Sequence, residues 1–444
     1  MNSLWSATAA RPERGPLTGS VHTDVLIIGG GMAGLLCAMQ LQRAGVSYVL
    51  TEAETICSGI TKNTTAKLTL QHGLIYHKLI RQFGIERAQM YLHANAAALE
   101  EYRTLCRKID CDFEEKTAFV YTLDDRRALE QELSALDALH FRAQYAQRLP
   151  LPFSTAGAVK FSNQAQFHPL KFAYAIEKEL NLYEHTPVLE LTEHGAVTKH
   201  GTIRAEKTIV ATHFPFLNRH GSYFLKQYQH RSYVIALENA ANVDGMYVDA
   251  SKTGLSFRSA QNLLLLGGGG HRTGKQGGNW RELDAFAKKH YPHSREVFRW
   301  AAQDCMTLDG VPYIGQYSRH TENLYVATGF NKWGMTSSMA AAMILRDLIT
   351  GADSPCAAVF SPSRSILRPQ LAGNACTSVL NLLTPTAPRC PHLGCALKWN
   401  AQEHSWDCPC HGSRFAGDGT LLDNPATGDL KQSGEGISRP KRDG

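Results

Sequence analysis

Apolar runs and helical periodicities alternate along most of the chain. Residues 24–28 (DVLII) form a short, continuously apolar run of the kind found in strands buried in parallel sheets, and residues 47–50 have the same character. Between them, residues 33–44 show a helical pattern that ends at Gly45. A strand, a helix and a second strand in this order predict a βαβ unit at the front of the chain.

The same alternation continues to about residue 352. Helices are predicted at residues 86–108, 126–139, 169–180, 281–290 and 336–349, and strands at residues 118–122, 207–211, 231–237, 262–266 and 324–327. This pattern predicts an α/β (α+β) fold, with a Rossmann-like nucleotide-binding domain and an inserted mixed-sheet substrate domain. We place the nucleotide-binding parts at about residues 21–80, 181–215 and 305–352, and the substrate parts at about 81–180 and 216–304.

The two ends of the chain differ from this body. Residues 1–20 have no apolar core segment and are expected to be a disordered tail rather than a secretion signal. Proline and serine are frequent in residues 353–385, which we interpret as a linker to a cysteine-rich segment at 386–444.

Composition excludes several classes of function. The chain has 444 residues, of which 43% are hydrophobic and 19% charged, as in ordinary globular proteins. The net charge of +6 is scattered along the sequence, so no nucleic-acid partner is expected. No apolar run approaches the roughly 20 residues of a membrane span. We therefore expect a cytoplasmic protein.

A glycine motif follows the first predicted strand. Gly29, Gly31 and Gly34 form G-x-G-x-x-G at the start of the first helix, where glycines allow a tight turn, close approach of a pyrophosphate, and helix–strand packing. Glu52 ends the second strand, where a carboxylate binds ribose hydroxyls. Together these features predict a dinucleotide site. Residues 269–275 imitate a P-loop, but Gln276 replaces the required Ser or Thr and no helix follows.

The cysteines are unevenly distributed. Four of the eleven fall within 21 residues, beside two histidines: Cys390, His392, Cys395, Cys408, Cys410 and His411. Such crowding in a reducing compartment indicates a metal site. Two Cys and two His could hold zinc tetrahedrally, or iron and sulfide.

Separate motifs in the body resemble the D-amino-acid oxidase/glycine oxidase superfamily. They are TLDGVPYIG at 307–315, NLYVATGF at 323–330, WGMT at 333–336, SGITKNTTAK at 58–67 and TPVLEL at 186–191. The resemblance implies FAD as the dinucleotide. It implies that the motifs supply flavin and adenine contacts beside the glycines and Glu52, namely Thr64, Thr65, Lys67, Val188, Gly329, Phe330, Gly334, Met335 and Thr336.

The loops CPHLGC (390–395) and CPCHGS (408–413) resemble those of Rieske proteins. The resemblance implies a [2Fe–2S] cluster with Cys390 and Cys408 on one iron and His392 and His411 on the other. It also implies a Cys395–Cys410 disulfide that clamps the two loops. The segment is short for a complete Rieske fold, so we expect its base to be truncated or borrowed from the FAD domain.

The combination resembles bacterial FAD-dependent oxidoreductases with a C-terminal Rieske domain. It implies hydride transfer to FAD from a C–H bond next to an amine nitrogen, then single electrons to the cluster and to a protein or quinone-like acceptor. Arg231, Tyr233 and Trp333 are the candidate substrate contacts, with a structural ion pair as the alternative for Arg231. Two other interpretations are an electron-transfer reductase that feeds an oxygenase, and an FAD enzyme of RNA modification.

Overall fold

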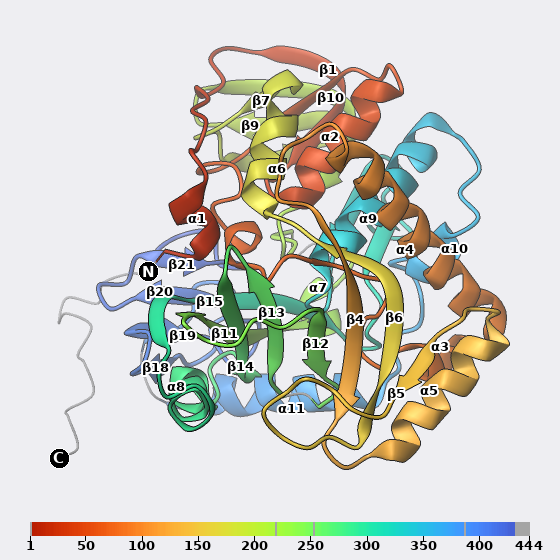
Figure 1. The fold of residues 1–444 in the computed structure, drawn as a ribbon. Helices are drawn as coiled ribbons and strands as arrows, with labels where there is room; N and C mark the ends of the chain where they lie inside the picture. The colour runs from red at the N-terminus through yellow and green to blue at the C-terminus, as the bar shows by residue number, and fades with distance from the viewer. Residues whose placement is uncertain (1, 218–219, 252–253, 386–387, 431–444) are drawn as a thin grey trace.

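The computed structural model describes residues 2–217, 220–251, 254–385 and 388–430, and Figure 1 shows three sheets within them. The first sheet has the order β16-β17-β10-β1-β2-β7, with β8 and β9 attached at β10. Its strands are β1 (Val21–Ile28), β2 (Tyr48–Thr51), β7 (Leu182–Tyr183), β8 (Val188–Thr192), β9 (Gly195–Thr198), β10 (Gly201–Val210), β16 (Tyr313–Gln316) and β17 (Leu324–Thr328). Strands β17, β10, β1 and β2 are parallel, as the sequence predicts for a nucleotide-binding domain.

The second sheet belongs to the inserted domain and is mixed. Its order is β15-β11-β14-β13-β12-β4-β6-β3, with β5 beside β6. Its strands are β3 (Lys67–Leu68), β4 (Glu114–Thr122), β5 (Gln144–Ala146), β6 (Gly157–Gln166), β11 (Gln227–Glu238), β12 (Met246–Asp249), β13 (Ser256–Ala260), β14 (Leu263–Arg272) and β15 (Arg295–Thr307). Residues 269–272 continue β14 as a strand, which agrees with rejecting a P-loop there.

Helices cover both sheets. They are α1 (Leu4–Thr8), α2 (Met32–Arg43), α3 (Tyr76–Phe83), α4 (Ile85–Cys106), α5 (Arg126–Ala138), α6 (Pro169–Ile176), α7 (Tyr223–Lys226), α8 (Asn279–His290), α9 (Gly334–Thr350), α10 (Ala357–Phe360) and α11 (Pro369–Leu383), with 3-10 turns η1 (Ile60–Asn63) and η2 (Glu177–Glu179). The sequence predicts α2, α4, α5, α8 and α9 to within a few residues. Helix α9 ends at Gly351, whose φ of 74° is the left-handed conformation that glycine adopts at helix ends.

Two terminal segments differ from the expectation. Residues 1–20 contain α1, in which Leu4 and Trp5 are buried, and Trp5 Nε1 donates to the Thr64 carbonyl at 2.7 Å. Burial of a tryptophan against the body of the protein makes this segment an ordered part of the core. Residues 353–385 contain α10 and α11 rather than only extended linker.

The third sheet forms the C-terminal segment. Strands β18 (Lys398–Asn400), β19 (Ser405–Asp407), β20 (Arg414–Ala416) and β21 (Leu421–Asp423) form an antiparallel meander around a small core. Figure 1 shows these strands, in blue, beside β11, β14 and β15. A sheet of such short strands buries little apolar area by itself, so its contacts with the inserted domain contribute to its stability. No helix in the described part of the chain is long and apolar enough to cross a membrane.

Candidate functional site: an FAD cavity beside a Rieske centre

A cavity of about 890 Å³ lies between the nucleotide-binding and inserted domains. This is near the upper end of the roughly 300–1,000 Å³ that small-molecule and cofactor sites span. Ten of the predicted cofactor residues line it, namely Gly29, Gly31, Glu52, Thr64, Thr65, Lys67, Val188, Phe330, Gly334 and Met335. The remaining three lie behind the wall: Gly34 packs on Gly29, Gly329 packs on Thr307, and the Thr336 hydroxyl bonds the backbone of Thr69.

The glycine loop fits a bound pyrophosphate. A Cβ at Gly34 would lie 1.9 Å from the Gly29 carbonyl oxygen, so Gly34 is needed for helix–strand contact. At Gly31, by contrast, a Cβ would meet only Thr61 Oγ1, at 3.6 Å. The protein itself therefore leaves room at Gly31, which lies on the cavity wall at the N-terminus of α2. Such space before a helix N-terminus is what a phosphate group requires.

Charged groups along the cavity are shifted by burial. Burial raises the pKa of Glu52, although its Oε2 accepts a hydrogen bond from the Gly30 amide at 2.6 Å. Burial and the neighbouring Arg258 lower the pKa of Lys67 to about 7, and Lys67 Nζ donates to Thr65 Oγ1 at 3.0 Å. Part of the Lys67 population is therefore neutral at physiological pH.

The cavity wall near α9 is made rigid by aromatic contacts. The rings of Trp333 and His72 are stacked, with centroids 5.1 Å apart. His72 Nδ1 lies 2.5 Å from the Tyr91 hydroxyl, and Nε2 lies 2.8 Å from the Thr69 carbonyl. Burial lowers the pKa of His72 to about 3, so this ring is a neutral support for Trp333.

The predicted cluster ligands converge in the C-terminal segment. The side chains of Cys390 and Cys408 interact directly, and the rings of His392 and His411 have centroids 5.0 Å apart. The two thiols and the two imidazoles thus form the two pairs that a Rieske cluster requires. His411 Nδ1 is buried and has no hydrogen-bond partner among the residues described, as an iron-ligating nitrogen should.

Each ligand loop is closed by its own backbone. The Gly394 amide donates to the Cys390 carbonyl, and the Gly412 amide donates to the Cys408 carbonyl, at 2.9 and 3.0 Å. Cys395 and Cys410 form a disulfide between the loops, as the Rieske resemblance implies. A third loop joins them through the Ala426 amide, which donates to Ser413 Oγ at 3.0 Å.

The ligand loops lie against the FAD domain. Phe214, just after β10, contacts the ring of His392 edge-on, and Phe224 in α7 contacts the ring of His411 in the same way. Asn424 Nδ2 donates to the carbonyls of Thr212 and Phe214, at 2.7 and 3.1 Å. Residues 211–213 themselves line the cavity. One backbone segment therefore contacts both the cavity and the cluster loops.

Further hydrogen bonds attach the second ligand loop to the inserted sheet. Arg272 Nε and Nη2 donate to the carbonyls of Pro409 and Cys410, at 3.2 and 3.1 Å. Gln303 Nε2 donates to the Gly412 carbonyl at 2.9 Å. A Cβ at Gly412 would lie 2.5 Å from the side chain of Gln229, so only glycine allows this approach.

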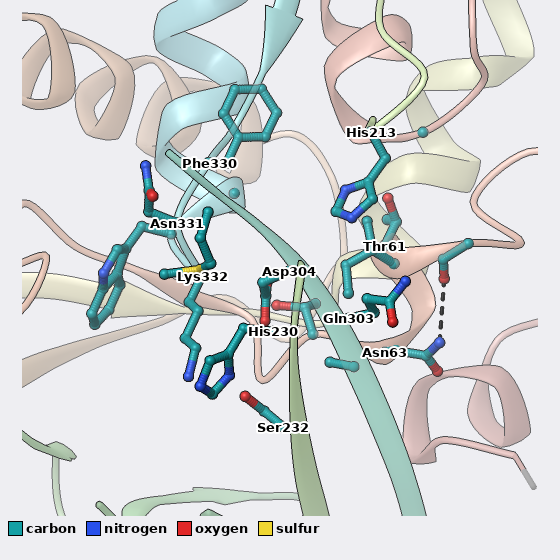
Figure 2. A pocket seen from close by; sticks show the side chains of 18 of the residues that line it. Thr61, Asn63, His213, His230, Ser232, Gln303, Asp304, Phe330, Asn331 and Lys332 are labelled. Carbon is teal, nitrogen blue, oxygen red and sulfur yellow. Dashed lines mark hydrogen bonds between the residues drawn. The ribbon is translucent and has the colours of Figure 1, made fainter. Parts of the chain in front are cut away.

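Arg231 and Tyr233, two of the candidate substrate contacts, bind the C-terminal segment through their side chains. Arg231 is paired with Glu403 of the C-terminal segment, and the Tyr233 hydroxyl donates to Glu403 Oε1 at 2.9 Å. Side chains alternate along a strand, so these two lie on the buried face of β11 while their neighbours His230 and Ser232 project into the cavity, as Figure 2 shows. The structural ion pair is the interpretation that the geometry supports for Arg231, because Glu403 already occupies its guanidinium. Arg231, Tyr233 and Trp333 all line the cavity, but Glu403 engages the side chains of the first two.

Several cavity residues were not found from the sequence. His213, His230, Asp304 and Lys332 approach the cavity from four different segments (Figure 2). Lys332 lies between two of the motifs that resemble the superfamily, and neither motif indicates a lysine with a special role. His230 and Asp304 depend on which strand residues face inward, which the sequence alone leaves open, and His213 lies in the loop after β10.

Comparison with known proteins agrees with this geometry. Residues 24–348 match the FAD dependent oxidoreductase (DAO) family, and residues 382–433 match the Rieske [2Fe-2S] domain. The chain belongs to the DAO family of FAD-dependent oxidoreductases. It therefore carries two cofactors, FAD and a Rieske-type [2Fe–2S] cluster.

The relatives share this organisation to different extents. YhfW of Bacillus subtilis (strain 168), which bears the name of a Rieske 2Fe-2S iron-sulfur protein, is 32% identical over 97% of both chains. Gamma-glutamylputrescine oxidoreductase of Escherichia coli (strain K12) is 24% identical over 76% of this chain and 85% of its own. The crystal structure of glycine oxidase from Geobacillus kaustophilus superposes with a TM-score of 0.65 at 20% identity, covering 78% of this chain and 99% of that one.

Proposed function

We propose that this DAO-family oxidoreductase is a dehydrogenase for an amine or amino-acid-type substrate, acting on CH–NH or CH–NH2 groups. The substrate loses a hydride from the carbon next to nitrogen and a proton from nitrogen, and becomes an imine. FAD supplies the two-electron acceptor, and the cluster supplies a one-electron route to an external acceptor, either a protein or a quinone-like molecule. The names of the relatives, which include amine and amino-acid enzymes, support this substrate class.

The observation that carries the proposal is the position of the cluster loops. They dock on residues 212–214 and on the buried face of β11 and β15. Each of these three segments also has residues on the cavity wall. A one-electron centre that docks beside the wall of a flavin site supports the proposal that it receives electrons from the flavin. An enzyme that transfers both electrons to oxygen has no use for such a relay.

The proposal is tested by adding substrates to the holoenzyme without oxygen. A panel of amines, N-methyl amino acids and amino acids is screened for flavin bleaching, with NADH as the comparison that would favour a reductase. The bleaching substrate is then added without any mediator, and the reduced Rieske signal is followed by electron paramagnetic resonance.

We expect the cluster signal to grow as the flavin is reoxidised. A Gly31→Val protein that retains its cluster but lacks FAD should give no signal, because only the flavin accepts electrons from the substrate. Bleached flavin beside a cluster that stays oxidised would refute the relay. Bleaching by NADH alone would refute the substrate class.

A further inference from the structure

One end of the cavity combines charges of opposite sign on three neighbouring elements. His230 on β11 and Asp304 on β15 are directly paired in the antiparallel register, so both side chains project from the same face of the sheet. Lys332 approaches them from the turn between β17 and α9. Figure 2 shows the Lys332 chain extending towards His230, with Asp304 beside them.

The turn that carries Lys332 is held in an unusual conformation. Asn331 and Lys332 have φ angles of 53° and 74°, in the left-handed region that is unfavourable for a non-glycine residue. The Asn331 side chain fixes this turn, since its Oδ1 accepts from the Thr307 amide at 2.8 Å and its Nδ2 donates to the Gly329 carbonyl at 2.6 Å. Strain of this kind persists at functional sites, where it positions a side chain.

Neither charge is neutralised by direct contact. Among the residues that the structure describes, Asp304 and Lys332 make no hydrogen bond through their side chains and no ion pair within 4.0 Å. Burial raises the pKa of Asp304, and burial lowers the pKa of Lys332, with each opposed by the charge of the other. Asp304 is half-buried and Lys332 is exposed, and both line the cavity, so a ligand there can reach each charge. A ligand that carries a cation and an anion would satisfy both.

We propose that Lys332 and Asp304 together bind a zwitterionic amino-acid substrate, with the Lys332 ammonium on the substrate carboxylate and the Asp304 carboxylate on the substrate nitrogen. This inference rests on the proposed function and narrows it from amines in general to amino acids. Arg231 cannot take the carboxylate role, because Glu403 occupies its guanidinium. The positive charge that recognises the carboxylate therefore comes from a turn of the nucleotide-binding domain.

The test uses pairs of ligands that differ only by the carboxylate: N-methylglycine with dimethylamine, proline with pyrrolidine, and phenylalanine with 2-phenylethylamine. Each is titrated into the anaerobic holoenzyme. Its half-saturating concentration is read from the perturbation or bleaching of the flavin spectrum. The variants are Lys332→Met, Lys332→Arg and Asp304→Asn, and the matched control is Lys289→Met, which removes a lysine charge from the exposed side of α8.

Substitutions at Lys332 and at Asp304 should affect the binding of amino acids and of amines differently. Lys332→Met should weaken amino acids about 10- to 100-fold, which is about 1.4–2.8 kcal/mol, and change the amines less than about twofold. Lys332→Arg should recover most of the loss. Asp304→Asn should weaken both members of a pair by similar factors, because both carry the amine. Lys289→Met should change neither.

Three results would overturn the inference: equal losses for amino acid and amine in Lys332→Met, no loss for either, or no pair that perturbs the wild-type flavin. The proposed function fails separately. If amino acids perturb the flavin in a Lys332-dependent way but never bleach it, the binding site stands and the reaction class does not.

Discussion

Glu403→Gln removes the buried charge that joins the Rieske segment to the FAD domain. Glu403 lies between β18 and β19, and its carboxylate contacts Arg231, Arg414 and Tyr233. The side chains of Arg231 and Glu403 are only 5% and 9% exposed. Glutamine has nearly the same shape but no charge, so this variant tests the charge itself.

The expected loss of folding stability follows from the two arginines, Arg231 and Arg414, that Glu403→Gln leaves without this carboxylate. Removing one partner of a buried ion pair costs about 3–5 kcal/mol. Asp407 and Asp423 still neutralise Arg414, whereas Asp423 lies 3.9 Å from Arg231 and compensates it weakly. Because unfolding 444 residues has an entropy of about 0.9 kcal/mol/K, such a loss lowers the Tm of a cooperative transition by about 3–5 °C.

Calorimetry of the holoenzyme measures this shift in Tm. The rate of reduction of a one-electron acceptor measures electron transfer from the flavin through the cluster. The acceptor rate should fall while anaerobic flavin bleaching keeps its rate, since the β11 side chains that project into the cavity in Figure 2, His230 and Ser232, lie on the face opposite Arg231. Glu190→Gln, at an exposed glutamate of β8, is the control and should leave both unchanged. The double variant Arg231→Met/Glu403→Leu should recover most of the stability, because a well-packed apolar pair can replace a buried ion pair.

The effect should depend on pH in one direction. Burial alone would raise the pKa of Glu403, but the charges of Arg231 and Arg414 overcome this and hold it below its ordinary value. A depressed carboxyl pKa stabilises the fold above about pH 4.3, and this stabilisation is lost as the pH falls through the folded pKa. The difference in Tm between wild type and Glu403→Gln should therefore be largest near neutral pH. It should diminish as the pH falls below about 4. An unchanged Tm together with an unchanged acceptor rate would refute this account of the interface.

Other predictions concern the two cofactors. Gly31→Val should abolish FAD binding while the apoprotein still folds, whereas Gly34→Ala should destabilise the fold itself; flavin content and Tm measure the two effects, and a yellow Gly31→Val protein would contradict the site. Protein made with sufficient iron and sulfur should hold one [2Fe–2S] cluster with a Rieske resonance spectrum, and stoichiometric zinc without acid-labile sulfide would contradict it. His411→Cys should lower the cluster potential by roughly 250 mV or more, the difference between the two cluster classes, and slow acceptor reduction while single-turnover bleaching remains; an unchanged acceptor rate with the cluster present would exclude the segment from the electron route.

The sequence predicts those parts of the fold that depend on local pattern. The βαβ unit, the long α4 and the G-x-G-x-x-G loop are each encoded by neighbouring residues, so their positions are right to within a few residues. The ligand loops are also local, since C-x-H and C-x-x-H bring their donors together on one short turn each. Residues 1–20 gave no such signal, because α1 owes its order to the distant contact of Trp5 with Thr64.

The choice that the sequence left open at Arg231 and Tyr233 has one physical cause, which is that a strand has two faces. Arg231 and Tyr233 were chosen for their chemistry, but an alternating strand sends them to the face opposite His230 and Ser232. Either face could have been the cavity side until the partner of each was known. That partner is Glu403, which is 172 residues away from Arg231 in the sequence, and no local sequence pattern predicts this contact. His230 and Asp304 were missed by the same uncertainty of one position, whereas His213 and Lys332 lie outside the strands.

The two faces of β11 also explain why a small Rieske sheet can be sufficient. Its strands have three residues each, too few to form an independent core, yet its ligand loops are enclosed because the FAD domain supplies Phe214, Phe224 and Gln229 as covering side chains. A cluster covered in this way cannot swing to a distant partner without exposing those rings and breaking the Arg231–Glu403 pair. The same contacts that complete the fold therefore hold the cluster loops beside the cavity wall. In the electron route that we propose, the relay is stationary for this reason. Weakening the interface by Glu403→Gln should therefore slow electron transfer even when the cluster and its potential are unchanged.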